Sequence, residues 1–154
     1  MKSILLVCLG NICRSPMAEA MLIAKLDKRG WSEFFRVDSA GTGGWHEGEL
    51  ADPRTFATLE RHEIRQKLIA RQIRPEDFES FDLILASDQS NLRELHRRCP
   101  PEFRPKLSLV LDLVGGGEVP DPYYGDDTDF ERVYALLDEA LEAWLERWAA
   151  EIVK

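Results

Sequence analysis

A strand, a tight loop and a helix are predicted, in that order, by the sequence Ile4-Leu5-Leu6-Val7-Cys8-Leu9-Gly10-Asn11-Ile12-Cys13-Arg14-Ser15-Pro16. The four apolar residues at its start are typical of a strand buried on both faces of a parallel sheet. Gly10 and Asn11 tolerate left-handed backbone angles, which suits a tight loop. Ser15 is a favourable N-cap, and Pro16 suits the first helical turn, where its missing N–H costs nothing. The loop is therefore expected to join the carboxyl end of a strand to the positive end of a helix.

The predicted loop has the composition of an anion-binding site. Backbone N–H groups in such a loop point inward at a helix N-terminus and bind oxyanions. These donors favour a thiolate at Cys8, and the planar fork of Arg14 suits two phosphate oxygens at once. A Cys-x5-Arg spacing by itself occurs by chance, and the alternative for Cys8 is an inert buried thiol. The position at a strand–loop–helix junction favours the catalytic interpretation.

Length, charge and cysteine content narrow the class of protein. The chain of 154 residues fits one domain, residues 1–154, with a substantial core. Its net charge of −8 argues against nucleic-acid binding, which needs a basic face. Three cysteines without a Cys-x2-Cys spacing argue against a disulfide framework or a metal site. The sequence has neither a signal-peptide pattern nor an apolar run of ~18–20 residues, so we expect no membrane association and a cytoplasmic location.

Predicted strands alternate with predicted helices along the chain. We expect strands at residues 2–7, 35–40, 82–86 and 106–111, and helices at 15–29, 53–62, 75–81, 90–98 and from about 128 onward. Residues 41–45 form a glycine-rich loop, residues 64–73 have no clear pattern, and residues 112–127 are irregular. The alternation indicates α/β architecture with a doubly wound parallel sheet, in which ligands bind beyond the carboxyl ends of the strands. The Cys8 loop leaves the first strand at that edge.

Asp121-Pro122-Tyr123-Tyr124 is the best candidate for the acid that a phosphate-transferring thiolate needs. It follows the last predicted strand, so it is expected at the same edge of the sheet as the Cys8 loop. Proline after Asp121 biases that residue away from helix. An aspartate before proline is by itself usually a turn residue, and only its combination with the Cys8 loop favours catalysis. The two tyrosines are candidates for an aromatic wall around a flat substrate ring.

Together these motifs resemble the low-molecular-weight protein tyrosine phosphatase family. The resemblance runs almost end to end, because further segments occur in the order and approximate spacing of the family: 38–42, 70–72, 82–88 and 90–92. It implies a three-layer flavodoxin-like fold with a four-stranded parallel sheet, strand order 2-1-3-4, and helices on both faces. It also implies hydrolysis of protein phosphotyrosine through a phosphocysteine intermediate, without metal or other cofactor. Phosphotyrosine proteins and phosphate-like anions are the implied partners, and the implied assembly is a monomer or weak dimer.

The resemblance assigns a role to each candidate residue. Cys8 matches the nucleophile, Arg14 the phosphate clamp and Asp121 the general acid, which then activates water. Ser15 stabilises the thiolate as leaving group, and Cys13 is implied to form a reversible disulfide with Cys8. The remaining assignments are the phosphate-binding loop (Leu9, Gly10, Asn11, Ile12, Cys13, Ser15), the supporting network (Ser39 and His62 around Asn11, and Asp88) and the substrate wall (Trp45, Tyr123, Tyr124).

Several positions keep alternatives open. His62, taken alone, reads as a surface residue at a helix end, and Trp45 as a core or lid residue. The apolar Ile12 favours phosphotyrosine, since the protein-arginine phosphatases of this superfamily carry threonine there. Glu63 stands where the family commonly has glycine, so a positive backbone angle there would strain the turn. Ser87 likewise replaces a more usual methionine.

Two other activities are also conceivable. An arsenate reductase would need two further cysteines close together near residues 80–90, and this chain has none there. Cys99 stands alone and matches nothing functional. A phosphoprotein-binding pseudophosphatase would lack the nucleophile, the clamp or the acid, whereas all three types are present.

Overall fold

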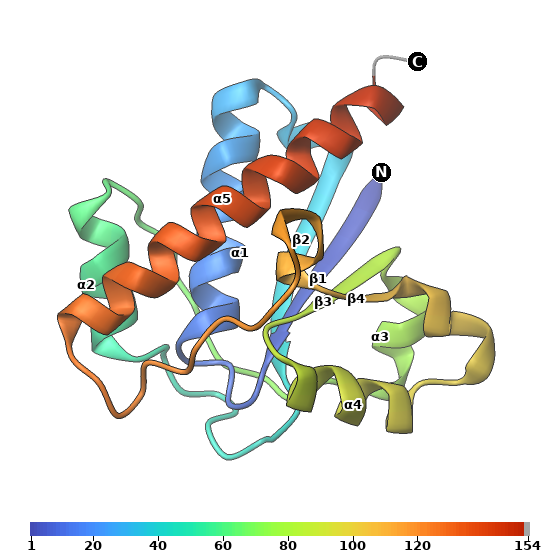
Figure 1. Cartoon of the computed structure of the whole chain (residues 1–154), viewed down its shortest axis with the longest axis horizontal. Helices are drawn as coiled ribbons and strands as arrows, with labels where there is room; N and C mark the ends of the chain where they lie inside the picture. Colours follow the sequence, from blue (N-terminus) through green and yellow to red (C-terminus); the bar gives the residue numbers. More distant parts are fainter. Residues whose placement is uncertain (153–154) are drawn as a thin grey trace.

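The computed structural model describes residues 1–152 and contains a four-stranded parallel sheet between two layers of helices (Figure 1). The strand order is β2-β1-β3-β4, with β1 paired in parallel to both β2 and β3. The predicted fold class and strand order are therefore confirmed. The strands are β1 (Lys2–Cys8), β2 (Phe35–Gly41), β3 (Leu83–Ala86) and β4 (Leu107–Leu109).

Helices cover both faces of this sheet. One layer contains α1 (Arg14–Arg29), α2 (Pro53–Arg61) and α5 (Asp127–Ile152), and the other contains α3 (Pro75–Ser80) and α4 (Gln89–Arg98). The described residues also contain three short 3-10 helices: η1 (Ser32–Phe34), η2 (Pro101–Lys106) and η3 (Val110–Val114).

The side chains of β1 feed two hydrophobic cores. Ile4 and Leu6 pack with α1 and α5, whereas Leu5 and Val7 pack with α3 and α4. All four are at most 1% exposed. Burial on both faces explains why this strand is uninterruptedly apolar instead of alternating with polar residues.

Helix ends follow the local sequence, with one exception. Gly30 ends α1 with φ of 73°, and the Asp52 carboxylate accepts a hydrogen bond from the Arg54 N–H to cap α2. Ser15 is not the N-cap of α1, because the helix begins one residue earlier, at Arg14. The Ser15 hydroxyl is directed to the Cys8 sulfur instead.

The fourth strand is shorter than predicted. It ends at Leu109, and residues 110–114 form η3. Two side chains stabilise this turn: the Asp112 carboxylate accepts from the Leu109 N–H at 2.9 Å, and Trp144 donates its indole N–H to the Val110 carbonyl at 2.8 Å. Residues 107–111 therefore belong to two elements, β4 and η3. The composition of this segment did not indicate the boundary between them.

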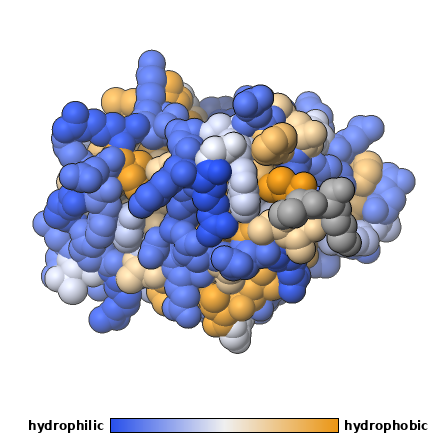
Figure 2. Space-filling model, turned by 90° about the horizontal axis from the view of Figure 1, so that it is seen from above, coloured by the Kyte–Doolittle hydropathy of each residue, from blue (hydrophilic) through white to orange (hydrophobic). Residues whose placement is uncertain are grey.

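The face at the amino ends of the strands is mainly hydrophilic. Figure 2 shows this face, on which hydrophobic residues gather only in separate small areas. Scattered apolar side chains of this kind are normal on protein surfaces. Within residues 1–152, no helix is both long enough and apolar enough to cross a membrane.

Glu63 has a positive φ, as expected at a position where the family commonly has glycine. Its φ is 61°, and its side chain is exposed just after α2. The turn is fixed by hydrogen bonds from the N–H groups of Glu63 to the Glu60 carbonyl and of Ile64 to the Leu59 carbonyl. A non-glycine residue in this region carries steric strain.

Glu63→Gly is expected to raise the free energy of unfolding by about 0.5–1 kcal/mol, because relief of strain exceeds the added entropy of the unfolded chain. Urea unfolding of both proteins checks this. The matched control is Ala57→Gly at an exposed position within α2, where glycine should lower stability by about 1 kcal/mol. Equal losses in the two variants would show that the angle at Glu63 carries no strain.

Candidate active site

The loop from Cys8 to Arg14 turns its carbonyl oxygens outward. The Cys8 carbonyl accepts from the Thr42 N–H, the Leu9 carbonyl from the Gly43 N–H, and the Ile12 carbonyl from the Asp52 N–H, at 2.9–3.0 Å. In a planar trans peptide the N–H points opposite to the C=O. The N–H groups that follow these carbonyls therefore face the inside of the loop, next to the N-terminus of α1, where an anion is favoured.

Close backbone packing at Gly41 supports the loop from outside. Gly41 ends β2 directly beside Cys8. A Cβ atom at this position would lie 2.8 Å from the Leu9 carbonyl oxygen and 2.9 Å from that of Gly43. Both contacts are with backbone, which cannot swing away, so only glycine fits.

Asn11 holds the loop in a left-handed turn. Its φ is 59°, and its side chain is 1% exposed. The amide group donates to Ser15 Oγ at 2.8 Å and to Ser39 Oγ at 2.9 Å, while its oxygen accepts from the Arg71 N–H at 2.9 Å. Three hydrogen bonds from three parts of the chain stabilise an otherwise unfavourable backbone conformation.

The predicted role of His62 in this network is wrong. His62 Nε2 lies 2.8 Å from a carboxylate oxygen of Glu131, and its ring stacks on Tyr134 at 3.7 Å between centroids. His62 is an exposed residue at the C-cap of α2, as its alternative interpretation predicted, and it joins the end of α2 to α5. The backbone of Arg71 contacts Asn11 instead, and the guanidinium of Arg71 is held by Asp38 and Asp77.

Glu19 extends the Asn11 network and was missed in the sequence. Ser39 Oγ accepts from Asn11 and donates to Glu19 Oε1 at 2.5 Å. Burial raises the pKa of Glu19 to about 7, although the Ser39 hydrogen bond opposes the shift. An acidic residue within the apolar pattern of α1 was the available signal, but its partner Ser39 lies on β2 and was not predictable from spacing.

Cys8 lies at the bottom of the loop with its sulfur surrounded by donors. Its side chain is buried, Ser15 Oγ is 3.0 Å from the sulfur, and the Asn11 N–H donates to it at 3.3 Å. Because Asn11 already donates to Ser15 Oγ, the Ser15 hydroxyl proton is free to point at Cys8. At the neighbouring Cys13, burial and the nearby Asp52 carboxylate raise the pKa of the thiol to about 12.

Arg14 is a buried cation with fixed orientation. Its side chain is 4% exposed and donates to Asp88 Oδ2 at 2.7 Å and to the Val119 carbonyl at 3.0 Å. Burial disfavours the charge, but Cys8, Asp88 and Asp121 outweigh it and raise the pKa of Arg14. Asp88 also caps α4 by accepting from the Asn91 N–H at 2.7 Å, so it holds Arg14 from a helix N-terminus. Asp88, predicted only as a member of the supporting network, thus contacts Arg14 directly.

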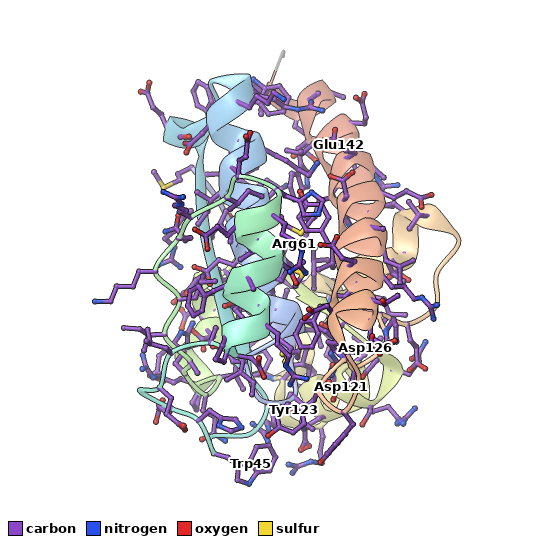
Figure 3. The ribbon with its side chains drawn as sticks, turned by 90° about the vertical axis from the view of Figure 1, so that its left-hand side faces the viewer. Trp45, Arg61, Asp121, Tyr123, Asp126 and Glu142 are labelled. Carbon is purple, nitrogen blue, oxygen red and sulfur yellow. The ribbon has the colours of Figure 1, made fainter. Side chains whose placement is uncertain are left out.

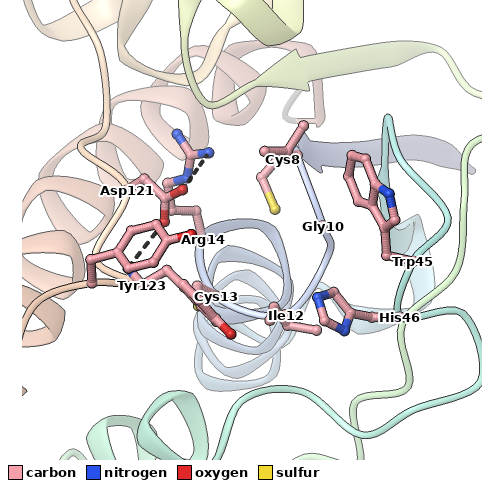
Figure 4. Close-up of a pocket in the computed structure, with 11 residues that line it drawn as sticks. Cys8, Gly10, Ile12, Cys13, Arg14, Trp45, His46, Asp121 and Tyr123 are labelled. Carbon is pink, nitrogen blue, oxygen red and sulfur yellow. Dashed lines mark hydrogen bonds and ion pairs between the residues drawn. The ribbon is translucent and has the colours of Figure 1, made fainter.

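A cavity of about 260 Å³ opens above Cys8 (Figure 4). Trp45 stands on one side and Tyr123 on the other, with Asp121 next to the Arg14 guanidinium at 3.9 Å. Asp121 is 44% exposed and accepts a hydrogen bond from the Tyr123 N–H. The lining residues are Cys8, Leu9, Gly10, Ile12, Cys13, Arg14, Trp45, His46, Asp121, Tyr123 and Tyr124.

The predicted substrate wall therefore surrounds one cavity, although its members differ in exposure. Tyr124 is 95% exposed and Trp45 70%, whereas Tyr123 is 41% exposed. His46 also lines this cavity and was missed. Its ring packs against Gly10, where a Cβ atom would lie 3.2 Å from His46 Cδ2. Its position directly after Trp45 in the glycine-rich loop was the only signal for it.

The departure at Ser87 is accommodated without disturbing the site. Ser87 is 4% exposed, and both its N–H and its hydroxyl donate to the Val7 carbonyl at 2.9 Å. This hydroxyl therefore has a partner within the core. Within residues 1–152, no cluster of three or more His, Cys, Asp or Glu side chains is arranged to hold a metal ion.

The chain matches a known family over most of its length. The family model described as low molecular weight phosphotyrosine protein phosphatase matches residues 3–154. The chain belongs to this family. The human low molecular weight phosphotyrosine protein phosphatase is 43% identical over 152 residues, which cover 95% of each chain.

Solved structures of such phosphatases resemble the chain closely. A protein tyrosine phosphatase from Entamoeba histolytica has a TM-score of 0.94 at 37% identity, covering 98% of this chain and 99% of that one. An arginine phosphatase from Drosophila has a TM-score of 0.89 at 34% identity, covering 96% and 98%. Membership in the low-molecular-weight phosphatase family makes this chain a protein tyrosine phosphatase, a hydrolase of phosphoprotein substrates.

Glu19→Gln tests the buried carboxyl of this phosphatase. The folded-state pKa of Glu19, about 7, lies above its usual 4.5, so the fold favours the protonated form. The contribution of Glu19 to the free energy of unfolding is therefore fully present below about pH 4.5 and is lost as the pH rises through about 7. Relative to the glutamine variant, which does not titrate, the wild type should lose on the order of 3 kcal/mol across this range.

Denaturant unfolding of both proteins at several pH values between 4.5 and 8 measures the difference between their free energies of unfolding. The other titrating groups are shared, so they cancel in the comparison. Parallel stability curves for the wild type and the glutamine variant would contradict the protonated assignment.

Proposed function

We propose that this protein hydrolyses phosphotyrosine in proteins through a phosphocysteine intermediate on Cys8. One observation carries the proposal: a buried thiol, a buried guanidinium and a carboxyl group converge on one cavity. Cys8, Arg14 and Asp121 come from β1, α1 and the loop before α5. The inward N–H groups of the loop supply the donors that a phosphoryl group requires.

In the first step, the Cys8 thiolate attacks phosphorus and the bond to the tyrosine oxygen breaks. The loop N–H groups and the Arg14 fork bind the nonbridging oxygens, whose charge the same donors stabilise in the transition state. Asp121, as the carboxylic acid, donates its proton to the departing tyrosine oxygen. Its place in the cavity lining beside Arg14, with 44% of its side chain exposed, supports this role.

In the second step, water attacks the phosphocysteine. Asp121, now a carboxylate, takes a proton from this water, and the sulfur leaves as a thiolate. The Ser15 hydroxyl, 3.0 Å from the sulfur, stabilises that thiolate. Asn11 keeps the hydroxyl in place by donating to its oxygen. Phosphate is released, and the enzyme returns to its starting state.

The walls of the cavity favour an aromatic substrate. Ile12, Trp45 and Tyr123 offer apolar surface around the path to Cys8, and a phenyl ring packs well against such groups. A short phosphoserine side chain would not reach the sulfur across this rim. Phosphoarginine is the second candidate, since the structurally similar Drosophila protein is an arginine phosphatase.

Cys13 and Cys99 have different proposed fates. Cys13 lines the cavity near Cys8, and its raised pKa keeps it a neutral thiol. We propose that peroxide first oxidises Cys8 to a sulfenic acid. Cys13 then loses its proton and attacks that sulfur, water leaves, and a Cys8–Cys13 disulfide forms, which a thiol reductant converts back to two thiols. Cys99 packs in the core with Leu95 and lies outside the cavity lining, which disfavours a reductase relay.

Phosphate release from phosphotyrosine, phosphoserine and phosphoarginine peptides tests the proposal for wild type and Cys8→Ser. Phosphotyrosine should be hydrolysed at least ~10²-fold faster than the other two, and the variant should be inactive because serine is a far weaker nucleophile. EDTA should not change the wild-type rate. A preference for phosphoarginine would overturn the substrate assignment, and activity of the variant would overturn the nucleophile.

Asp121→Ala should slow cleavage of poor leaving groups most. Phenyl phosphate, whose leaving group needs a proton, should lose about 10²-fold in kcat/KM, whereas nitrophenyl phosphate should lose far less. The matched control is Asp127→Ala, since Asp127 is an exposed aspartate at the start of α5, close in sequence to Asp121 but outside the cavity lining. Equal losses on both substrates would show that Asp121 is not the general acid.

A further inference from the structure

Arg54 joins the loop that carries Asp121 to the rest of the protein. Its guanidinium donates to the Tyr123 carbonyl at 2.9 Å and to the Gly125 carbonyl at 3.1 Å. Both carbonyls follow Asp121 within four residues. Arg54 belongs to the first turn of α2, so this helix reaches across to a loop almost seventy residues later.

The same guanidinium is anchored on its other side. Asp52, with a side chain 9% exposed, accepts from Arg54 Nε at 3.0 Å and from Nη2 at 2.9 Å. Arg54 also lies over the ring of Phe130, 4.6 Å from its centroid. The bidentate contact with the Asp52 carboxylate and the aromatic face of Phe130 together fix the orientation of the Arg54 guanidinium.

Asp52 links this pair to the phosphate-binding loop. Its backbone N–H donates to the Ile12 carbonyl at 3.0 Å, and the Thr55 hydroxyl donates to that carbonyl at 2.8 Å. The first turn of α2 therefore contacts the loop of the nucleophile through Ile12 and the loop of the acid through Tyr123. Both halves of the site are positioned from one rigid element.

Asp121 itself is held only weakly. Its carboxylate accepts from the Tyr123 N–H at 3.1 Å and lies 3.9 Å from the Arg14 guanidinium, and its side chain is 44% exposed. The segment before it contains Gly115, Gly116 and Gly117, all with positive φ, which restrain the chain little. Closer to Asp121, Val119 is anchored, because its N–H donates to the Ser87 carbonyl at 2.9 Å and its carbonyl accepts from Arg14 at 3.0 Å. Between Val119 and the start of α5, the place of Asp121 depends on how the residues after it are attached.

We propose that Arg54 is a positioning residue that sets the place of the Asp121 carboxyl relative to Cys8 by binding the Tyr123 and Gly125 carbonyls. The proposal rests on the proposed function, in which Asp121 is the general acid. Arg54 touches no reacting atom. Its removal should therefore reduce proton donation to the leaving group while leaving phosphate binding by the Cys8 loop intact.

The test compares Arg54→Ala with Arg61→Ala. Arg61 is on the same helix and pairs with Glu131 of α5 at 2.7 Å, away from Asp121 and Tyr123 (Figure 3). Arg54→Ala should lower kcat/KM for phenyl phosphate about 10-fold or more and for nitrophenyl phosphate less than about 3-fold. Arg61→Ala should change neither value beyond about 2-fold, because the exposed ion pair with Glu131 and the hydrogen bond to Thr58 Oγ1 that it removes involve no residue of the Asp121 loop.

A double variant shows whether Arg54 acts through Asp121. Adding Arg54→Ala to Asp121→Ala should cause no further selective loss on phenyl phosphate, because the proton donor is already absent. Additive losses, or equal losses on both substrates from Arg54→Ala alone, would overturn the positioning role. If Asp121→Ala itself shows no selectivity, the proposed function fails instead, so the two failures are distinguishable.

Arg54→Lys keeps the inference testable if the alanine variant does not fold. Lysine retains the charge but is a point donor, which cannot bind Asp52 in bidentate fashion and two carbonyls together. A selective loss on phenyl phosphate of about 3-fold or more is expected, with inhibition by inorganic phosphate unchanged. Wild-type selectivity in this variant would contradict the role of the fork.

Discussion

The left-handed turn at Asn11 is the constraint on which the site depends. Without it, the loop would not reverse around Cys8 and turn its N–H groups inward. The angle carries a cost of about 1–2 kcal/mol for a residue with a Cβ. Three hydrogen bonds, to Ser15, Ser39 and the Arg71 N–H, offset that cost at about 1 kcal/mol each.

The same network of hydrogen bonds extends to the Cys8 sulfur. Glu19, Ser39, Asn11 and Ser15 form a chain of hydrogen bonds that ends at the Cys8 sulfur. Asn11 donates to both serine hydroxyls, and Ser39 donates onward to Glu19. Burial raises the pKa of Glu19 and so favours its neutral form, which places no negative charge in this network.

Local charge in the site opposes the overall charge of the protein. The chain carries a net charge of −8, yet its substrate is an anion. The N-terminus of α1, the inward N–H groups and Arg14 supply attraction within the cavity, where burial limits screening. The Asp88 carboxylate keeps Arg14 in place and also caps α4.

Local sequence predicted the features that depend on nearby residues. The apolar strand, the loop from Cys8 to Arg14, the Gly30 helix end and the parallel sheet were all found as expected. So was the placement of Asp121 at the Cys8 edge, because carboxyl ends of parallel strands share one edge.

The errors and omissions involve contacts between distant segments. His62 was placed beside Asn11 but faces α5, and β4 ends early because Asp112 and Trp144 stabilise a turn. Arg54 and Glu19 were missed, since their partners Tyr123 and Ser39 lie far away in the sequence. Spacing reports periodicity within an element, whereas these pairs are set by how elements pack.

The measurement that tests this account most directly is a rapid quench into alkaline denaturant during turnover of a phosphotyrosine peptide, followed by peptide mapping at alkaline pH with mass spectrometry. The account predicts phosphate covalently attached to the Cys8 sulfur, and none on the enzyme after Cys8→Ser. Phosphate on another residue, such as His46, or turnover with no phosphorylated enzyme at any quench time, would contradict it.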